Sequence, residues 1–129
     1  MEEARTHLTK AVERLTSGQI DFAAARYHSC ANQAYYACFQ AAVAALLAAG
    51  IRPASPRGAW SHACVQSQFN GLLIIRRKLY AAALRRVLRD TMTVRDKADY
   101  APALVSARVA SRVLQAVQDF VRAIQEKVR

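Results

Sequence analysis

The stretch FAAARYHSCANQAYYACFQAAVAALLAAGI, residues 22–51, decides the fold that we predict for this chain. One set of side chains returns in it every three or four residues: Phe22, Ala25, Ser29, Asn32, Tyr36, Phe39, Val43 and Leu46. That spacing is typical of one face of an α-helix. Alanine dominates the remaining positions, so neighbouring helices can approach closely on the other sides. Asp21 is the predicted N-cap and Gly50 the predicted end, which gives a helix over 21–49.

Helical periodicity also dominates the rest of the 129 residues. The further helices that we expect are 3–17, one that begins after Ser61, 78–92 and 101–127. Gly18 suits a C-terminal stop for the first of them, and Pro102 suits the first turn of the last. Residues 51–60, IRPASPRGAW, form the one clear loop, and no strand pattern or internal repeat occurs. The sequence therefore predicts an all-α, up-and-down antiparallel bundle of about five helices in a single domain, 1–129.

The chain is strongly basic, with 19 lysines and arginines against 9 acidic residues and a net charge of +10. Such a domain attracts polyanions, and nucleic acid is the first candidate, with an acidic partner protein as the alternative. Eight of the basic residues fall within 76–97: Arg76, Arg77, Lys78, Arg85, Arg86, Arg89, Arg95 and Lys97. A charged helix face is usually only solvated. This one carries a single sign and leads towards Arg95, as a track for phosphates would.

The cysteines and histidines do not predict a metal site. Three cysteines without a CxxC pair indicate reduced thiols. Histidine stands two positions before cysteine twice, at 28 and 30 and at 62 and 64, but residues two apart on a helix point about 200° apart, so neither pair is a natural chelate. We expect no metal and no cofactor. The charged segment MEEARTHLTK is no secretory signal and the apolar run 41–51 is too short to span a bilayer, so we expect a cytoplasmic protein without a membrane segment.

Three segments, taken in order, resemble the HEPN domain family. They are residues 22–51, the segment SHACVQSQF at 61–69 and RDKADY at 95–100. The last is similar to the Arg-x-x-Ala-Asp-Tyr element of one branch of the family. The resemblance implies a helical bundle that commonly forms a homodimer. Many members are metal-independent ribonucleases and act as toxins beside a small MNT-type nucleotidyltransferase antitoxin, whereas others are inactive relatives that bind nucleotides or assist a nucleotidyltransferase.

The stretch TVRDKADY, residues 93–100, which we expect to interrupt the chain between two helices, departs from the family at one position. Active members carry arginine, four to six further residues and then histidine, at the start of a late helix. Here the four residues after Arg95 are followed by Tyr100, and all histidines of the chain precede Arg95. That histidine therefore cannot be carried over. Arg57 and His62 have the same spacing, but about one such match arises by chance in a chain this rich in arginine, and this one stands at another helix.

Arg95, Tyr100 and His62 are the candidate catalytic residues. Arg95 can hold a phosphate through two parallel hydrogen bonds, and the alternative is an ion pair with Asp96 or Asp99. Tyr100 could bond to a phosphate, stack on a base or be a core aromatic, and its phenol is a poor base. Histidine suits proton transfer, so His62 could be a displaced acid–base group, or it could pack against or cap a helix end.

Five further residues are candidate substrate-binding residues: Asn32, Asp99, Arg89, Lys97 and Arg85. Asn32 is an amide on a packed stripe, so it must find partners and could bond to the segment that carries Asp99. A structural hydrogen bond is the alternative role. Asp99 could orient Arg95 and also cap the last helix. Tyr35 and Tyr36 are adjacent and point about 100° apart, so one of them should face the core.

Two main hypotheses on function follow. The first is a HEPN protein of a prokaryotic toxin–antitoxin or defence system that binds RNA and cleaves it without a metal. The second is a non-catalytic HEPN module that binds a nucleotide or partners an MNT-type nucleotidyltransferase. A third is a plain helical interaction domain whose charge serves an acidic protein.

Overall fold

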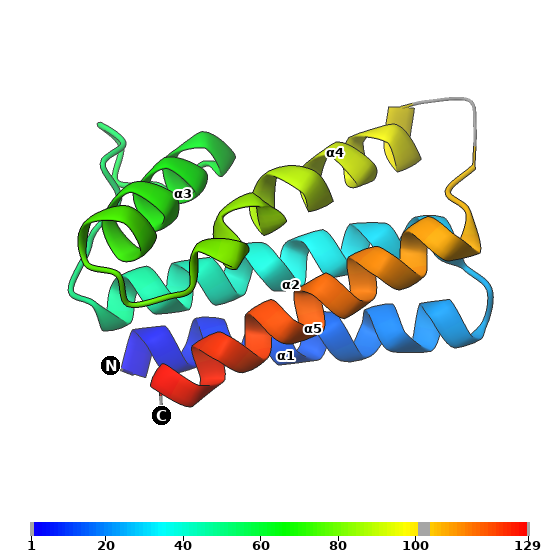
Figure 1. Ribbon diagram of the computed structural model, residues 1–129, viewed down its shortest axis with the longest axis horizontal. Coiled ribbons are helices and arrows are strands. Elements are labelled where there is room, and N and C mark those ends of the chain that lie inside the picture. Colours follow the sequence, from blue (N-terminus) through cyan, green and yellow to red (C-terminus); the bar gives the residue numbers. More distant parts are fainter. Residues whose placement is uncertain (1, 101–103, 129) are drawn as a thin grey trace.

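The computed structural model describes residues 2–100 and 104–128, apart from the side chain of Tyr100. Within them the chain is helical and has no strand (Figure 1). The helices are α1, Glu2–Ala23; α2, Tyr27–Ala48; α3, His62–Gln68; α4, Val87–Tyr100; and α5, Ala107–Lys127. A π-helical segment, Phe69–Arg76, continues α3, and a 3₁₀ turn, Ala82–Arg86, leads into α4. The predicted all-α bundle is confirmed.

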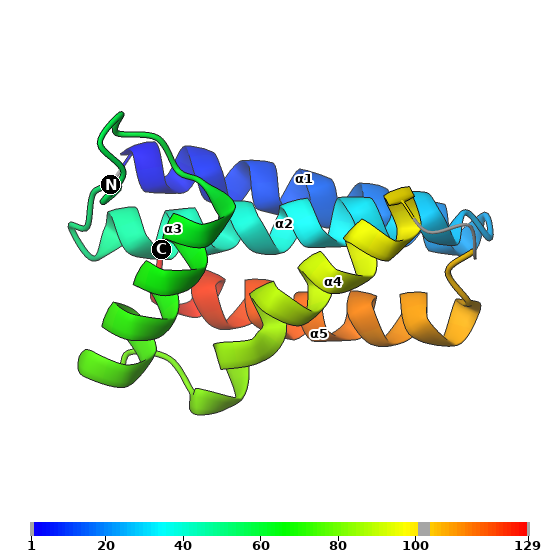
Figure 2. The ribbon, with the colours of Figure 1, turned by 90° about the horizontal axis from the view of Figure 1, so that it is seen from above.

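Helix α2 is the central element of the bundle. α1 runs antiparallel to it, α5 runs along it, α4 crosses over it and α3 lies across one end (Figure 1, Figure 2). Twelve residues of α2 are buried, and seven of those are alanine. Because alanine is small, three long helices pack against α2 at once. The larger core side chains, such as Phe69 and Phe120, come from the elements around it.

α1 does not stop at Gly18, as predicted, but continues to Ala23. Gly18 is buried where α1 meets its neighbours, and a Cβ built on it would lie 3.5 Å from Leu114 Cδ1 and 3.6 Å from Gln33 Cβ. The chain turns instead at Ala25, whose φ of 58° is left-handed. Gly18 therefore marks a close contact between helices and not a helix end.

Asp21 does not cap α2, because α2 begins at Tyr27, after Arg26. Asp21 is buried in α1, and its Oδ2 accepts a hydrogen bond from Ser29 Oγ at 2.5 Å. Its Oδ1 lies 2.9 Å from Nη2 of Arg26. The carboxylate therefore joins the last turns of α1 to the first turn of α2.

Two predicted helix ends are confirmed. Ser61 caps α3, since its Oγ accepts a hydrogen bond from the N–H of Cys64 at 3.1 Å. α2 ends just before Gly50, which has a φ of +78°. The N–H of Ile51 then bonds to the carbonyl of Leu46 at 2.9 Å, which closes the last turn.

The predicted helix 78–92 and the interruption at 93–100 are wrong. The backbone at position 78 is left-handed, with a φ of 50°, and α4 starts later and runs through 93–100 without a break. Leu88, Thr91 and Ala98 are buried on one face of α4. The Thr91 hydroxyl donates to the carbonyl of residue 87 at 2.7 Å, so this polar side chain is satisfied inside the helix. The polar segment is thus one more amphipathic helix.

The last helix also begins later than predicted. α5 starts at Ala107, and Ser106 caps it by accepting a hydrogen bond from the N–H of Val109 at 3.2 Å. Asp99 lies in α4 and does not cap α5, which corrects the role predicted for it. Pro102, the predicted first-turn residue, lies outside the described residues.

Cys30 gives the fold a dependence on alkaline pH. Its thiol is fully buried beside Ala110 and Leu114, and burial, together with the Asp21 carboxylate, raises its pKa from 9.0 to about 11. Between about pH 9 and 11 the folded protein keeps a proton that the unfolded chain releases. The free energy of unfolding should therefore fall there by about 1.4 kcal/mol per pH unit. Urea denaturation between about pH 9 and 11 should show a shallower fall for Cys30→Ala than for the wild type. Equal slopes for the two proteins would contradict this assignment.

Candidate functional site

Arg95 lies on the inner side of α4, against two aromatic rings of α2. Its side chain is 17% exposed. The guanidinium carbon lies 5.3 Å from the ring centre of Tyr36 and 5.7 Å from that of Tyr35. A guanidinium over an aromatic face is stabilised by the ring quadrupole. The arginine is therefore a fixed, nearly enclosed charge and not a mobile surface one.

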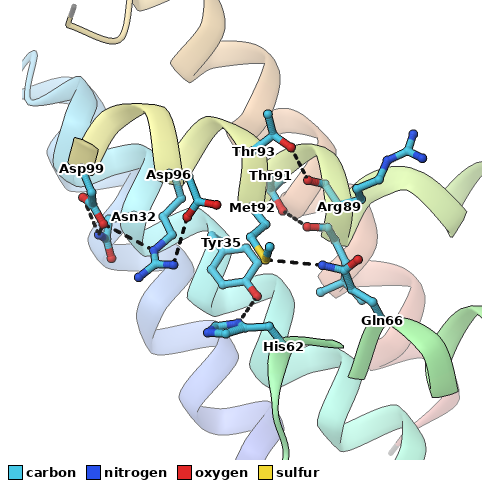
Figure 3. A network of polar contacts seen from close by, with 12 residues as sticks. Asn32, Tyr35, His62, Gln66, Arg89, Thr91, Met92, Thr93, Asp96 and Asp99 are labelled. Atoms are coloured by element: carbon cyan, nitrogen blue, oxygen red, sulfur yellow. Dashed lines mark hydrogen bonds and ion pairs between the residues drawn. The ribbon is translucent and has the colours of Figure 1, made fainter. Parts of the chain in front are cut away.

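Two carboxylates of α4 flank this guanidinium. Nη1 of Arg95 donates to Oδ1 of Asp96 at 3.3 Å. Nε lies 3.5 Å from Oδ2 of Asp99, a distance typical of an ion pair, although within the described residues this buried N–H makes no hydrogen bond. The expected bond across the bundle is present: Asn32 Nδ2 donates to both oxygens of Asp99 at 3.2 and 3.3 Å (Figure 3). Asn32 thus holds Asp99, and Asp99 faces Arg95.

His62 reaches the same two tyrosines from the first turn of α3. Its Nδ1 is hydrogen-bonded to the Tyr35 hydroxyl (Figure 3). Its ring centre lies 5.4 Å from that of Tyr35 and 5.3 Å from that of Phe39. Among the described residues, Nε2 of His62 has no hydrogen-bond partner. One imidazole nitrogen is therefore oriented by the fold and the other is available.

Tyr35 stays a neutral phenol at physiological pH. Its side chain is fully buried, and burial is the main cause that raises its pKa, with a further contribution from Cys38. The charge of Arg95 lowers that pKa, but by less. The prediction that one of the two adjacent tyrosines faces the core is confirmed, and Tyr35 is that residue.

Tyr35 connects the two candidate catalytic groups. The His62 ring centre and the Arg95 guanidinium carbon lie 5.4 and 5.7 Å from the centre of its ring. The two residues are 33 positions apart in the sequence and come from different helices. Arg57, which has the formal motif spacing to His62, is exposed in the preceding loop. Of these two arginines, Arg95 is the one shown to share a contact with His62, through the Tyr35 ring. We call the following side chains the Arg95 cluster: Arg95, His62, Tyr35, Tyr36, Asn32, Asp96 and Asp99.

The remaining basic candidates do not form one track to Arg95. Arg85 and Arg89 are exposed, and Arg89 Nε lies 3.5 Å from the neighbouring Asp90. Lys97 lies on another side of α4, in a groove between α4 and α5. Arg77 donates to a carbonyl at the end of α2 at 3.0 Å. The basic stripe read from the sequence is therefore divided among several faces.

The side chain of Tyr100 lies outside the described part of the chain, so its catalytic role stays a prediction.

Arg14 is a further residue beside the Arg95 cluster, and the sequence pattern did not predict it. Its guanidinium carbon, from α1, lies 5.5 Å from the ring centre of Tyr36. No pattern within α1 signals this contact, because it depends on how α1 packs on α2. Tyr36 thus has an arginine near it from each of two helices.

The described residues contain no group of three or more histidine, cysteine, aspartate or glutamate side chains placed to hold a metal ion. No helix within 2–100 or 104–128 is long and apolar enough to cross a membrane.

The chain matches the model of one protein family. The family model for the HEPN domain matches residues 4–127, which is nearly the whole chain and includes every helix that contributes to the cluster. A search of curated proteins finds no match. On the family match, together with its all-helical fold, the chain belongs to the HEPN family.

Proposed function

We propose that this HEPN domain binds RNA and cleaves it without a metal, with Arg95 and His62 as the working groups, as part of a prokaryotic toxin–antitoxin or defence system. The observation that carries the proposal is the shared contact of His62 and Arg95 with Tyr35. The buried ring of Tyr35 thus holds a cation on α4 and an imidazole on α3. The net charge of +10 favours the approach of a polyanion.

The proposed reaction is attack by a ribose 2′-hydroxyl on the adjacent phosphorus. The bond from phosphorus to the 5′ oxygen breaks, which leaves a 2′,3′-cyclic phosphate and a 5′-hydroxyl. One group takes the 2′ proton and another gives a proton to the leaving oxygen. His62 Nε2 can perform one of these transfers, since an imidazole nitrogen can accept a proton and give it up again. Arg95 would stabilise the charge that develops on the phosphate.

A phosphate would have to displace or share the hydrogen bond between Arg95 and Asp96. That carboxylate is 44% exposed and holds Arg95 at 3.3 Å, so the bond is one that an anion can compete with. Asp99 is held by Asn32 and would keep the guanidinium in place during the exchange. Of the remaining candidates, Arg85 and Arg89 are exposed and could bind more distant phosphates, whereas Lys97 faces elsewhere.

We further propose that two copies of the chain form a homodimer in which the Arg95 clusters share a cleft. A second copy would supply the second proton-transfer group that one histidine cannot provide. Tyr100 is the other candidate, because it stands where active relatives carry histidine. The proposed branch of the family is the one with Arg-x-x-Ala-Asp-Tyr in place of the arginine–histidine motif.

The test is digestion of tRNA and mRNA by the purified protein in EDTA. We expect cleavage that leaves 2′,3′-cyclic phosphate ends and that is reduced by about 10²–10⁴-fold in His62→Gln. Arg57→Ala is the matched control, since Arg57 has the motif spacing to His62 but is exposed in the loop. Intact RNA at high protein excess would rule out catalysis, and RNA binding that weakens steeply with salt would then support the binding role alone.

A second candidate function is a non-catalytic module that binds a nucleotide or partners an MNT-type nucleotidyltransferase antitoxin. The observation that favours it is that both carboxylates beside Arg95 offset its charge. This function predicts intact RNA in the digestion, and binding with no salt dependence would point to the protein partner. Growth arrest on expression, relieved by a neighbouring gene, would favour the toxin.

A further inference from the structure

A groove of about 770 Å³ separates α4 from α5 on the side of α4 away from the Arg95 cluster. Its lining comes from both helices and the segments before them: Ala83, Arg86, Val87, Asp90, Thr91, Val94, Lys97, Leu104, Val105, Ser106, Val109, Arg112, Val113 and Ala116. α4 crosses α5 at an angle and diverges from it towards the C-terminal end of α4 (Figure 1, Figure 2).

The groove combines an apolar floor with a basic rim. Valines from both helices make the floor, and Arg86, Lys97 and Arg112 stand along it. These three side chains are exposed, and none has an ion pair or hydrogen bond within the described residues. Asp90, the one carboxylate of the lining, already lies 3.5 Å from Arg89. The groove therefore has uncompensated positive charge above an apolar surface.

We propose that this groove binds an amphipathic helix of a partner protein, with an apolar stripe on its inner side and acidic residues on its flanks. On this side, the 3₁₀ turn and α4 line the groove from Ala83 to Lys97, which is about 20 Å of helix at 1.5 Å or slightly more per residue. A partner helix of four turns matches that length and would lay its apolar residues on the valines. Carboxylates on its flanks would complement the three cations.

Charge and composition favour this occupant over two others. A second copy that used the same groove would bring like charges together, which disfavours the contact. RNA would be attracted by the rim, but the lining contains no aromatic side chain on which bases could stack. The proposal does not depend on the proposed function, because the groove and the Arg95 cluster lie on different sides of α4.

The experiment uses a fluorescent synthetic peptide of about 15 residues, helical by design, with leucines on one stripe and glutamates on both flanks. Fluorescence anisotropy should show binding to the wild-type protein. The triple variant Arg86→Glu, Lys97→Glu, Arg112→Glu should bind about 10–100-fold more weakly. The matched control is Lys10→Glu, Arg57→Glu, Arg76→Glu, which changes the net charge equally at exposed positions outside the groove and should change affinity less than about threefold.

A second variant tests the apolar floor without changing charge. Ala116→Trp, at a half-buried position of the lining, should fill the groove and weaken peptide binding by about tenfold or more, with folding checked by circular dichroism. Equal binding of a peptide of the same composition with its leucine stripe scrambled would overturn the proposal, as would equal losses in the two triple variants. If single-stranded RNA binds the Arg86→Glu, Lys97→Glu, Arg112→Glu variant more weakly and the peptide does not, the groove is a nucleic-acid site instead. Arg95→Ala should leave peptide binding unchanged.

Discussion

On replacement of Arg95 by alanine, RNA cleavage should fall by about 10²–10³-fold while the protein remains folded. The guanidinium packs over the rings of Tyr35 and Tyr36 and is held by two carboxylates. A preorganised cation of this kind stabilises a transition state more than a mobile surface one, because little reorganisation is needed. The measurement is the initial rate of tRNA cleavage in EDTA, with thermal unfolding of the same samples.

Two variants give this prediction its controls. Arg95→Lys keeps the charge but loses the planar fork, so it should recover only part of the activity. Arg89→Ala removes an exposed arginine of the same helix that pairs with Asp90 and should lower cleavage by less than about tenfold. Full activity in Arg95→Ala would show that the guanidinium is a structural ion-pair partner and that the phosphate binds elsewhere.

The largest loss of stability should follow Tyr35→Ala, at about 3–5 kcal/mol. Tyr35 is among the largest side chains that are fully buried, and it contacts α3 through His62 and α4 through Arg95. Its removal would leave a cavity where three helices meet. Urea denaturation at neutral pH measures the free energy of unfolding directly.

Tyr35→Phe separates packing from hydrogen bonding. It keeps the ring but removes the hydroxyl that orients His62, so it should cost only about 1 kcal/mol of stability while lowering cleavage much more. Tyr36→Ala is the matched control at the neighbouring position. Because Tyr36 is only half-buried, this substitution should lower the free energy of unfolding clearly less than Tyr35→Ala does. Similar losses from the two alanine variants would mean that Tyr35 is not the residue on which the three helices converge.

The features of the fold that could be predicted are local ones. Ser61 caps the start of α3 and Gly50 follows the end of α2, each through bonds to residues only a few positions away, so sequence patterns reveal them. In the sequence, Gly18 resembles a helix end and Asp21 resembles a helix cap. In the fold, Gly18 makes room for a contact between helices and Asp21 joins α1 to α2. The boundaries of α4 could not be predicted from its many polar residues. Whether a residue such as Thr91 is buried depends on how α4 packs on α2 and α5.

The same distinction holds for the candidate site. The bond from Asn32 could be anticipated, because an amide on a packed face needs a partner and the 95–100 segment was already singled out. The contacts of Tyr35 with His62 and of Arg14 with Tyr36 could not, since each joins helices whose relative placement no spacing encodes. The spacing of Arg57 and His62 therefore carries no information on the site, whereas Arg95, which shares the Tyr35 ring with His62, lies 33 positions further along the chain.

The alanines of α2 also bear on how this protein can evolve. A side chain that grows at any of those seven buried positions must push a neighbouring helix away, at a cost of about 1–3 kcal/mol for each enlargement. A protein of ordinary stability tolerates few such changes. Inherited variation should therefore collect on the exposed faces of α4 and α5, where partners could change from lineage to lineage while the middle of the bundle stays the same.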